Sequence, residues 1–307
     1  MRHRIWRRVR RHWLGISVMA ALVMALPRGC ELLEQKEREL VFRVEASDAG
    51  WYRGIPESVE ELELRAEHFT PDESLHAWWW AHPEGDAPTL LYLHGVRWNL
   101  TGHLFRIEQL RDFGFSVLAI DYRGFGRSRG GIPSETSVYA DARVAWEYLK
   151  TLQPDPAKRL IYGHSLGGAV AVDLAAALAR ESVGQLPEVV GVIVESTFTS
   201  LGEAAAVVID TSLPVHWLLT QRFDSAAKVN RIGVPLLVVH GTEDNYVPAR
   251  LGEALYEAAD QPKQLLLVEG ANHNNSMRLA RRSYADAIAA LLGAGQLQFE
   301  MAGLAQD

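Results

Sequence analysis

The sequence predicts an α/β fold built on a doubly wound, mostly parallel sheet. Two observations lead to this prediction: short apolar runs alternate with helical patterns from about residue 60 onward, and each run is continuous rather than alternately apolar and polar. Continuous runs of valine, isoleucine and leucine are typical of parallel strands with helices on both faces. The 307 residues, 48% apolar and 22% charged, fit one large or two small globular domains and exclude disordered or fibrous proteins.

The sheet is expected to begin with an antiparallel strand pair. Residues 59–69 and 75–82 are rich in strand-forming residues, with turn-forming residues between them. Trp78, Trp79 and Trp80 lie in the second strand. Because successive strand side chains point to opposite faces, these rings are expected to pack on both sides of the sheet rather than to form a ligand platform.

The parallel part of the sheet follows. Six apolar runs bounded by Gly, Pro or Asp are predicted strands: 89–93, 116–120, 159–162, 189–194, 236–239 and 265–268. Five helical patterns alternate with them: 100–111, 135–152, 165–179, 249–259 and 275–292. In such sheets ligands bind at the carboxyl ends of the strands, so functional residues are expected just after each run.

Residues 1–30 are predicted to be a membrane anchor or signal segment. Six arginines precede Trp13, and residues 13–27 carry no charge. As a helix this stretch would span about 22 Å, short of the ~30 Å hydrocarbon core of a bilayer. Four alternatives stay open: a short uncleaved anchor, a lipidated Cys30 as in bacterial lipoprotein signals (which Arg28 fits poorly), a cleaved signal, or a buried first helix of a cytosolic protein. The arginines favour a bacterial inner-membrane location with the body in the periplasm.

Residues 31–58 are expected to be a linker and lead-in, with a short polar helix over 31–39, and residues 59–307 to form the catalytic domain. All 38 acidic residues lie after residue 30, whereas seven of the 31 basic residues precede it. An acidic body argues against nucleic-acid binding. Cys30 is the single cysteine, so no intramolecular disulfide and no cysteine-based metal cluster are expected.

The strongest functional signal is a G-x-S-x-G pattern. Residues 163–168 read GHSLGG, after the predicted strand 159–162 and at the start of an alanine-rich helix. A strand, a tight glycine turn and a helix form a nucleophile elbow, with the serine held at its tip. The sequence therefore favours Ser165 as a nucleophile over a glycine turn that merely starts a helix.

A serine nucleophile needs a base, and the base needs an acid. The polar loop 270–275, which reads GANHNN, places His273 after the last predicted strand. The loop after the strand at 236–239 places Asp244 at the same sheet edge, with Glu243 and Glu195 as alternative acids. The chain order serine, acid, histidine is the one expected at a nucleophile elbow of this kind.

Two backbone amides are expected to stabilise an oxyanion. One is the N–H of Leu166, directly after the predicted nucleophile. The other is the N–H of Val96, in the loop 94–99 that follows the strand at 89–93. Arg97 lies beside it, and two roles stay open: binding an anionic part of the substrate, or a salt bridge to the acidic surface.

Seven stretches together resemble the α/β-hydrolase superfamily, and within it the Bem46-type, serine-aminopeptidase-like hydrolases. They read LHG (93–95), DYRGFGRSRG (121–130), PSE (133–135), YGHSLGG (162–168), ESTFTSL (195–201), PLLVVHGTEDNYVP (235–248) and GANHNN (270–275). The resemblance covers about residues 60–293. It implies the α/β-hydrolase fold, a Ser165–Asp244–His273 triad, oxyanion amides at Val96 and Leu166, and no cofactor or metal.

Two further expectations concern the surroundings of the site. Asp121, in the second matching stretch, is expected to form a structural ion pair with Arg123 or Arg127. Residues 196–234 are expected to hold a small cap, with the apolar run 213–219 over the site, near a membrane or simply in helix packing.

The sequence thus predicts a membrane-anchored serine hydrolase. It would cleave a carboxylic ester or thioester, small or lipid-derived, through an acyl-enzyme intermediate. A serine aminopeptidase-like peptidase and a non-catalytic binding protein with the same fold are the alternatives, and the oligomeric state stays open.

Overall fold

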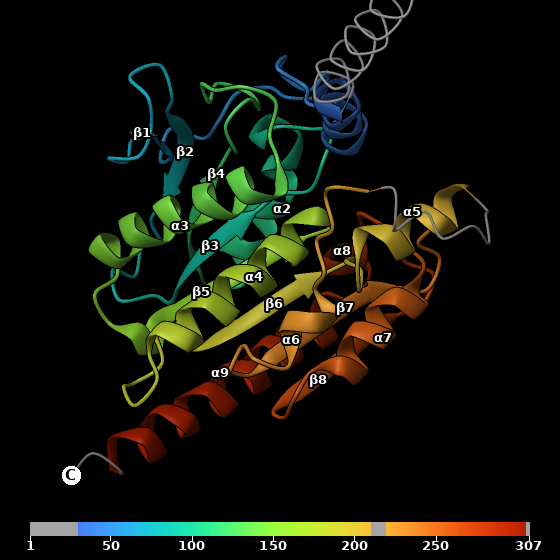
Figure 1. The fold of residues 1–307 in the computed structure, drawn as a ribbon. Helices are drawn as coiled ribbons and strands as arrows, with labels where there is room; N and C mark the ends of the chain where they lie inside the picture. The colour runs from blue at the N-terminus through green and yellow to red at the C-terminus, as the bar shows by residue number, and fades with distance from the viewer. Residues whose placement is uncertain (1–29, 210–218, 305–307) are drawn as a thin grey trace, which may run out of the picture.

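An eight-stranded sheet forms the centre of the protein in the computed structural model, which describes residues 30–209 and 219–304 (Figure 1). The strands are β1 (Glu60–Leu64), β2 (Leu75–Trp80), β3 (Thr89–Leu93), β4 (Ser116–Ile120), β5 (Arg159–His164), β6 (Gly191–Glu195), β7 (Leu236–Gly241) and β8 (Lys263–Val268). Their order is β1-β2-β4-β3-β5-β6-β7-β8, and β2 pairs antiparallel with both of its neighbours while the other pairs are parallel. The predicted α/β-hydrolase fold is confirmed.

The strand order locates the site. From β3 the chain first adds β4 on one side and then crosses to β5 on the other. Ligands of doubly wound sheets bind where the order reverses in this way, outside the carboxyl ends of the strands. The loops after β3 and β5 therefore meet at the expected crevice, and they are the two loops that carry Val96 and Ser165.

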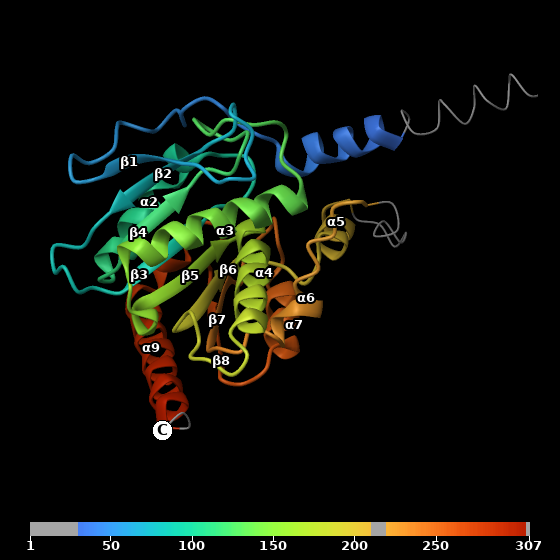
Figure 2. The same ribbon diagram turned by 60° about the vertical axis from the view of Figure 1, so that its left-hand side comes forward.

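Helices cover both faces of the sheet (Figure 2). The helices are α2 (Leu100–Asp112), α3 (Glu135–Leu152), α4 (Leu166–Glu181), α5 (Leu201–Ile209), α6 (Ala226–Val229), α7 (Ala249–Ala258), α8 (Ser276–Leu279) and α9 (Arg281–Leu304), with a 3₁₀ turn, η1, at Pro156–Lys158. Buried side chains of α3, α4, α6 and α7 share one hydrophobic core with one face of the sheet, and those of α2 and α9 share the second core with the other face.

Two predicted elements differ most from the structure, whereas the bounds of several others shift by one or two residues. The strand predicted over 59–69 ends at Leu64, because Leu64 pairs with Leu75 and the residues between them form the connection. The helix predicted over 275–292 is divided into α8 and α9, and α9 continues to Leu304. The expectation for the three tryptophans is confirmed: Trp78 and Trp80 pack against the core beneath α2, and Trp79 packs against the opposite core.

A helix over residues 30–42 precedes the sheet and includes the predicted polar helix 31–39. It stands out from the body on the same side as α5 (Figures 1 and 2). The predicted apolar segment 13–27 and residues 213–218 of the second apolar run lie outside the described residues. Within the described ranges, no helix is long and apolar enough to cross a membrane.

Candidate active site

Ser165 occupies a strained turn between β5 and α4. Its φ is 57° and its ψ −124°, a conformation that residues with a side chain rarely adopt. Close packing requires the flanking glycines: a β-carbon at Gly163 would lie 2.1 Å from the Gly167 oxygen, and one at Gly167 would lie 2.1 Å from the Leu93 oxygen. The turn is also tied to β6, because the Ser165 amide donates a 2.9 Å hydrogen bond to the Glu195 carbonyl. The predicted elbow geometry is therefore present.

The structure brings His273 and Asp244 together. Nδ1 of His273 lies 2.7 Å from Oδ2 of Asp244. The two loops are joined along their backbones, since Thr242 donates to Val268 at 3.0 Å and Glu243 donates to Ala271 at 2.9 Å. A carboxylate only accepts hydrogen bonds, so Nδ1 carries the ring proton and Nε2 is left as an acceptor. That tautomer is the one a general base requires.

Asp244 is held in its ionised form. Burial by itself raises the pKa of Asp244, but hydrogen bonds from the His240 and His273 rings and from the Val247 amide outweigh it and hold the pKa below its ordinary value. The amides of Tyr246 and Val247 both donate to Oδ1 at 2.9 Å. The carboxylate is thus charged throughout the neutral pH range and fixed in orientation.

The base loop is docked onto the elbow through His164. Nε2 of His164 donates a 2.9 Å hydrogen bond to the His273 carbonyl, and the two rings lie 4.8 Å apart. Burial, then the positive charge of Arg106, holds the pKa of His164 well below its ordinary value, so the ring is neutral. His164 directly precedes Ser165. In the described part of the chain no hydrogen bond joins the Ser165 hydroxyl to the His273 ring, and such contacts often tighten only when substrate binds.

The loop after β3, residues 94–99, lies against Ser165. A β-carbon built on Gly95 would be 3.0 Å from Cβ of Ser165. The backbone amides of Val96 and Leu166 make no hydrogen bond to any of the described residues. Leu166 opens α4, and the first N–H groups of a helix have no partner within it. Both predicted oxyanion donors are therefore free to bind a ligand oxygen.

Arg97 is exposed at the edge of this loop. Its φ of 85° is unusual for a residue with a side chain. The salt bridge considered as one of its roles is not present among residues 30–209 and 219–304.

Neither alternative acid contacts His273. Glu243 is exposed, whereas the fully buried Glu195 pairs with Arg106, from α2, at 2.7 Å. Glu195 also accepts hydrogen bonds from Tyr162 at 2.8 Å and Tyr284 at 2.9 Å. Sequence reasoning missed this buried pair. The available signal was that an arginine at 106 lies one residue before Ile107, on the apolar side of α2.

Removing the charge of Glu195 is expected to destabilise the fold. The Glu195→Gln variant leaves the buried Arg106 guanidinium without a counter-charge, which should lower the free energy of unfolding by about 3 kcal/mol. Urea denaturation, monitored by circular dichroism, measures this free energy of unfolding. Glu253→Gln, at an exposed position of α7 without an ion pair among the described residues, should change stability by less than ~0.5 kcal/mol. Equal unfolding midpoints for the two variants would contradict the expectation.

The predicted ion pair of Asp121 with Arg123 or Arg127 is wrong. The Asp121 carboxylate instead accepts a 2.8 Å hydrogen bond from the backbone amide of Leu100, at the start of α2. A carboxylate is favoured there by the unpaired amides and the positive end of the helix dipole. Arg123 pairs with Asp141 at 2.6 Å. Asp121 thus has a structural role, as predicted, but its partner is the start of α2, the helix that follows the Val96 loop.

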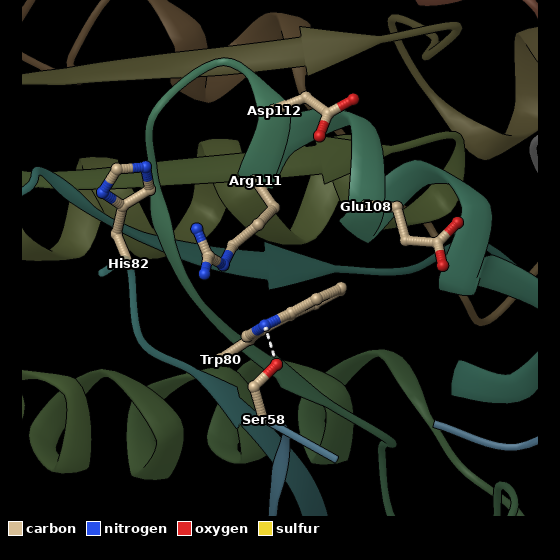
Figure 3. Close-up of a pocket in the computed structure, with 6 residues that line it drawn as sticks. All are labelled: Ser58, Trp80, His82, Glu108, Arg111 and Asp112. Atoms are coloured by element: carbon tan, nitrogen blue, oxygen red, sulfur yellow. Dashed lines mark hydrogen bonds between the residues drawn. The ribbon is translucent and has the colours of Figure 1, made fainter. Parts of the chain in front are cut away.

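No group of three or more His, Cys, Asp or Glu side chains within the described ranges is arranged to hold a metal ion. One hollow of about 570 Å³ lies where β2 and α2 end (Figure 3). There Trp80 donates a 3.0 Å hydrogen bond to Ser58, and the Arg111 guanidinium lies 5.3 Å from the Trp80 ring centre. Trp80 pairs with Val117, near the start of β4. The hollow therefore lies at the amino ends of the parallel strands, whereas Ser165 lies at their carboxyl ends.

Comparison with known proteins identifies the family. The family model for serine aminopeptidase S33 matches residues 87–227. An uncharacterized protein of Mycobacterium tuberculosis is 37% identical over 216 residues, which are 70% of this chain and 73% of that protein. The chain belongs to the α/β-hydrolase superfamily.

Further relatives of this hydrolase include enzymes with named activities. The lysophosphatidylserine lipase ABHD12 of Danio rerio is 33% identical over 204 residues, covering 61% of this chain and 51% of that protein. An α/β hydrolase of Vibrio vulnificus has a TM-score of 0.65 at 22% identity, covering 85% of this chain and 93% of its own. The esterase Pf2001 of Pyrococcus furiosus has a TM-score of 0.62 at 19% identity, covering 81% of this chain and 98% of the esterase chain. At these identities the two solved structures show the shared fold.

Proposed function

We propose that this hydrolase cleaves carboxylic ester or thioester bonds through an acyl-enzyme on Ser165. The observation that carries the proposal is the 2.7 Å His273–Asp244 contact in loops docked against the strained turn of Ser165. A serine hydroxyl is a weak nucleophile, and the imidazole of His273, oriented by Asp244, supplies the base that it needs. The free amides of Val96 and Leu166 supply the donors for the oxyanion.

The reaction follows from these positions. Oγ of Ser165 attacks the carbonyl carbon while Nε2 of His273 takes the hydroxyl proton, and Asp244 stabilises the imidazolium that forms. The carbonyl oxygen becomes an oxyanion that accepts hydrogen bonds from the amides of Val96 and Leu166. Collapse expels the alcohol or thiol, which receives the proton from His273. Water then attacks the acyl carbonyl carbon while Nε2 of His273 takes one of its protons. The bond from that carbon to Oγ of Ser165 breaks, Oγ receives the proton from His273, and the acid product leaves.

Two observations favour ester over peptide substrates. A site for the free amino end of a peptide needs an unpaired carboxylate near the nucleophile. The carboxylate of Glu195, whose backbone carbonyl accepts the Ser165 amide, is already paired with Arg106, and the exposed charge in the loop 94–99 is the cationic Arg97. The lysophosphatidylserine lipase ABHD12 is a relative whose name describes ester hydrolysis.

A substrate panel tests this proposal. Purified protein is offered p-nitrophenyl esters of graded chain length beside amino-acid arylamides, and active serine is labelled with a fluorophosphonate probe followed by peptide mapping. We expect ester hydrolysis and a label on Ser165. Hydrolysis of arylamides alone would support the peptidase alternative, and neither turnover nor label would support the non-catalytic binding protein.

We also propose that residues 1–30 attach the protein to the bacterial inner membrane, with the catalytic domain in the periplasm and a small or lipid-derived ester as substrate. The arginine-flanked apolar stretch 13–27 supports this location. Retention in the membrane pellet after alkaline carbonate extraction is the expected result. The mass of the mature N-terminus distinguishes an intact chain, a cleaved chain and a lipidated Cys30.

Arg97 is proposed to bind an anionic part of the substrate. Arg97→Ala should lower kcat/KM about 10-fold or more for esters that carry a phosphate or carboxylate, because a charge-assisted hydrogen bond is lost. Neutral esters of the same chain length should be affected far less. Arg180→Ala, at an exposed position near the end of α4, serves as the control for a general loss of positive charge. An equal loss on neutral and anionic esters would remove this role.

A further inference from the structure

We infer that residues 42–51, here called the lead-in segment, position the oxyanion loop 95–99 and thereby set the rate of the proposed reaction. The inference rests on the proposed function, because it assigns a role to the Val96 amide. It concerns a part of the chain that precedes the sheet and contains none of the predicted site residues. Three groups of contacts join the two segments.

The first contact fixes the strained backbone beside Val96. The carbonyl of Phe42 accepts a 3.1 Å hydrogen bond from the backbone amide of Arg97. That N–H lies in the peptide plane joining Val96 to Arg97, so the contact fixes the plane directly after the proposed oxyanion donor. Arg97 has a φ of 85°, which costs free energy in a residue with a side chain and persists only when its surroundings hold it.

The second group of contacts involves Asn99, at the end of the loop. Its side-chain amide donates to the carbonyl of Glu45 at 3.2 Å and to that of Ser47 at 2.9 Å. Asn99 is buried and is also the N-cap of α2, where its Oδ1 accepts the Thr101 amide. The lead-in segment therefore holds the residue at which the loop becomes helix.

The third group of contacts involves Ala49 and Trp51, later in the lead-in segment. The amide of Ala49 donates a 2.9 Å hydrogen bond to Oγ1 of Thr101. The rings of Trp51 and Trp98 meet edge to face, with centroids 4.8 Å apart. Five positions of the segment thus contact residues 97–101, and the loop is enclosed between this segment and the elbow of Ser165.

Phe42 is itself firmly anchored. Its side chain is fully buried and packs edge to face on Phe223, with ring centroids 6.0 Å apart. Phe223 belongs to the insertion between β6 and β7. One turn earlier, the carboxylate of Glu37 accepts the amides of Thr220 and Gln221 at 2.9 Å. The helix over 30–42 is therefore attached to the insertion, and its last residue is attached to the oxyanion loop.

A positioning role of this kind predicts a specific kinetic effect. Loss of one oxyanion donor lowers kcat by about 10²–10³-fold, so a displaced donor should give a smaller loss of the same type. The effect should fall on the transition state, because the oxyanion exists only there, and not on substrate binding. A purely structural segment would lower thermal stability and leave the kcat of the folded fraction unchanged.

Two mild variants of the full-length chain test the inference. Trp51→Ala removes the exposed ring that touches Trp98. With little change of shape, Thr101→Val removes the hydroxyl that accepts the Ala49 amide and donates to Oδ1 of Asn99. With a neutral p-nitrophenyl ester, we expect each to lower kcat on the order of 10-fold and to leave KM within about two-fold. The inhibition constant of a trifluoromethyl ketone, whose serine adduct carries an oxyanion, should weaken by the same factor. Trp51→Phe should restore most of both values.

Leu33→Ala is the matched control, because Leu33 is exposed on the preceding helix and makes none of the contacts described above. It should leave kcat and the inhibition constant unchanged. Loss of thermal stability with unchanged kcat, a change in KM alone, or a loss of kcat without weaker ketone binding would each overturn the inference. A wild-type protein that neither hydrolyses esters nor is labelled by fluorophosphonate would instead overturn the proposed function, and with it the basis of this role.

Discussion

Ser165→Ala is expected to lower kcat for ester hydrolysis by about 10⁶-fold. The variant lacks the only atom that can form the acyl-enzyme, and the remaining His273–Asp244 pair has no hydroxyl to activate. Initial rates with a short p-nitrophenyl ester measure the loss, and fluorophosphonate labelling should disappear together with it. The small side chain should be well tolerated in the elbow, so the folded fraction and its melting temperature should remain close to those of the wild type.

Ser182→Ala is the matched control, since Ser182 follows the last turn of the same helix, α4, at its other end. It should retain both turnover and labelling. If Ser165→Ala kept a rate within about ten-fold of the wild type, a serine nucleophile at this position would be excluded. The fold assignment would survive that result, because it rests on the sheet and on the comparisons.

Asp244→Asn is expected to lower kcat by about 10⁴-fold. The asparagine amide can donate to Nδ1 of His273, which favours the tautomer with the proton on Nε2. That nitrogen then cannot accept the Ser165 proton. Binding of substrate does not involve the acid, so KM should change far less than kcat.

The pH dependence of Asp244 follows from its lowered pKa. A carboxyl group whose pKa is lower in the folded state stabilises the fold above its unfolded value of about 3.9, and this stabilisation is lost as the pH falls through the folded-state pKa. Protonation of Asp244 should therefore not contribute to any loss of kcat above about pH 4. Asp260→Asn, at an exposed position, is the control and should leave the pH–rate profile unchanged. A fall in kcat of less than ten-fold in Asp244→Asn would contradict the assigned role.

Much of the site could be predicted because it lies on a regular frame. Continuous apolar runs mark the buried strands, and parallel strands bring their carboxyl ends to one edge, so residues as distant as Asp244 and His273 had to approach each other. The glycines around Ser165 marked the turn, and the close approach of Gly163 to Gly167 and of Gly167 to Leu93 in β3 explains why nothing larger fits. These are local patterns whose spatial consequence is fixed by topology.

The parts of the site that could not be predicted depend on contacts between residues that no local sequence pattern connects. Nothing in the composition of residues 42–51 indicates that Phe42 would bind the Arg97 amide, because the contact uses a backbone carbonyl. Arg106 and Glu195 are 89 positions apart and form their pair only after α2 packs on the sheet. Asp121 was assigned the wrong partner for a related reason: neighbours in sequence were preferred to the amide of Leu100, which the fold brings closer.

The packing around the elbow also limits where new specificity can arise. Gly167 faces the Leu93 carbonyl with no room for a methyl group, so any larger residue at this position would have to displace the backbone of β3. Changes of specificity are expected instead at exposed positions of the neighbouring loops, such as Arg97 in the loop 94–99 and the largely exposed Tyr246, whose ring lies 5.5 Å from that of His273. Laboratory evolution toward other acyl groups should accordingly mutate these outer positions and leave the inner turn intact.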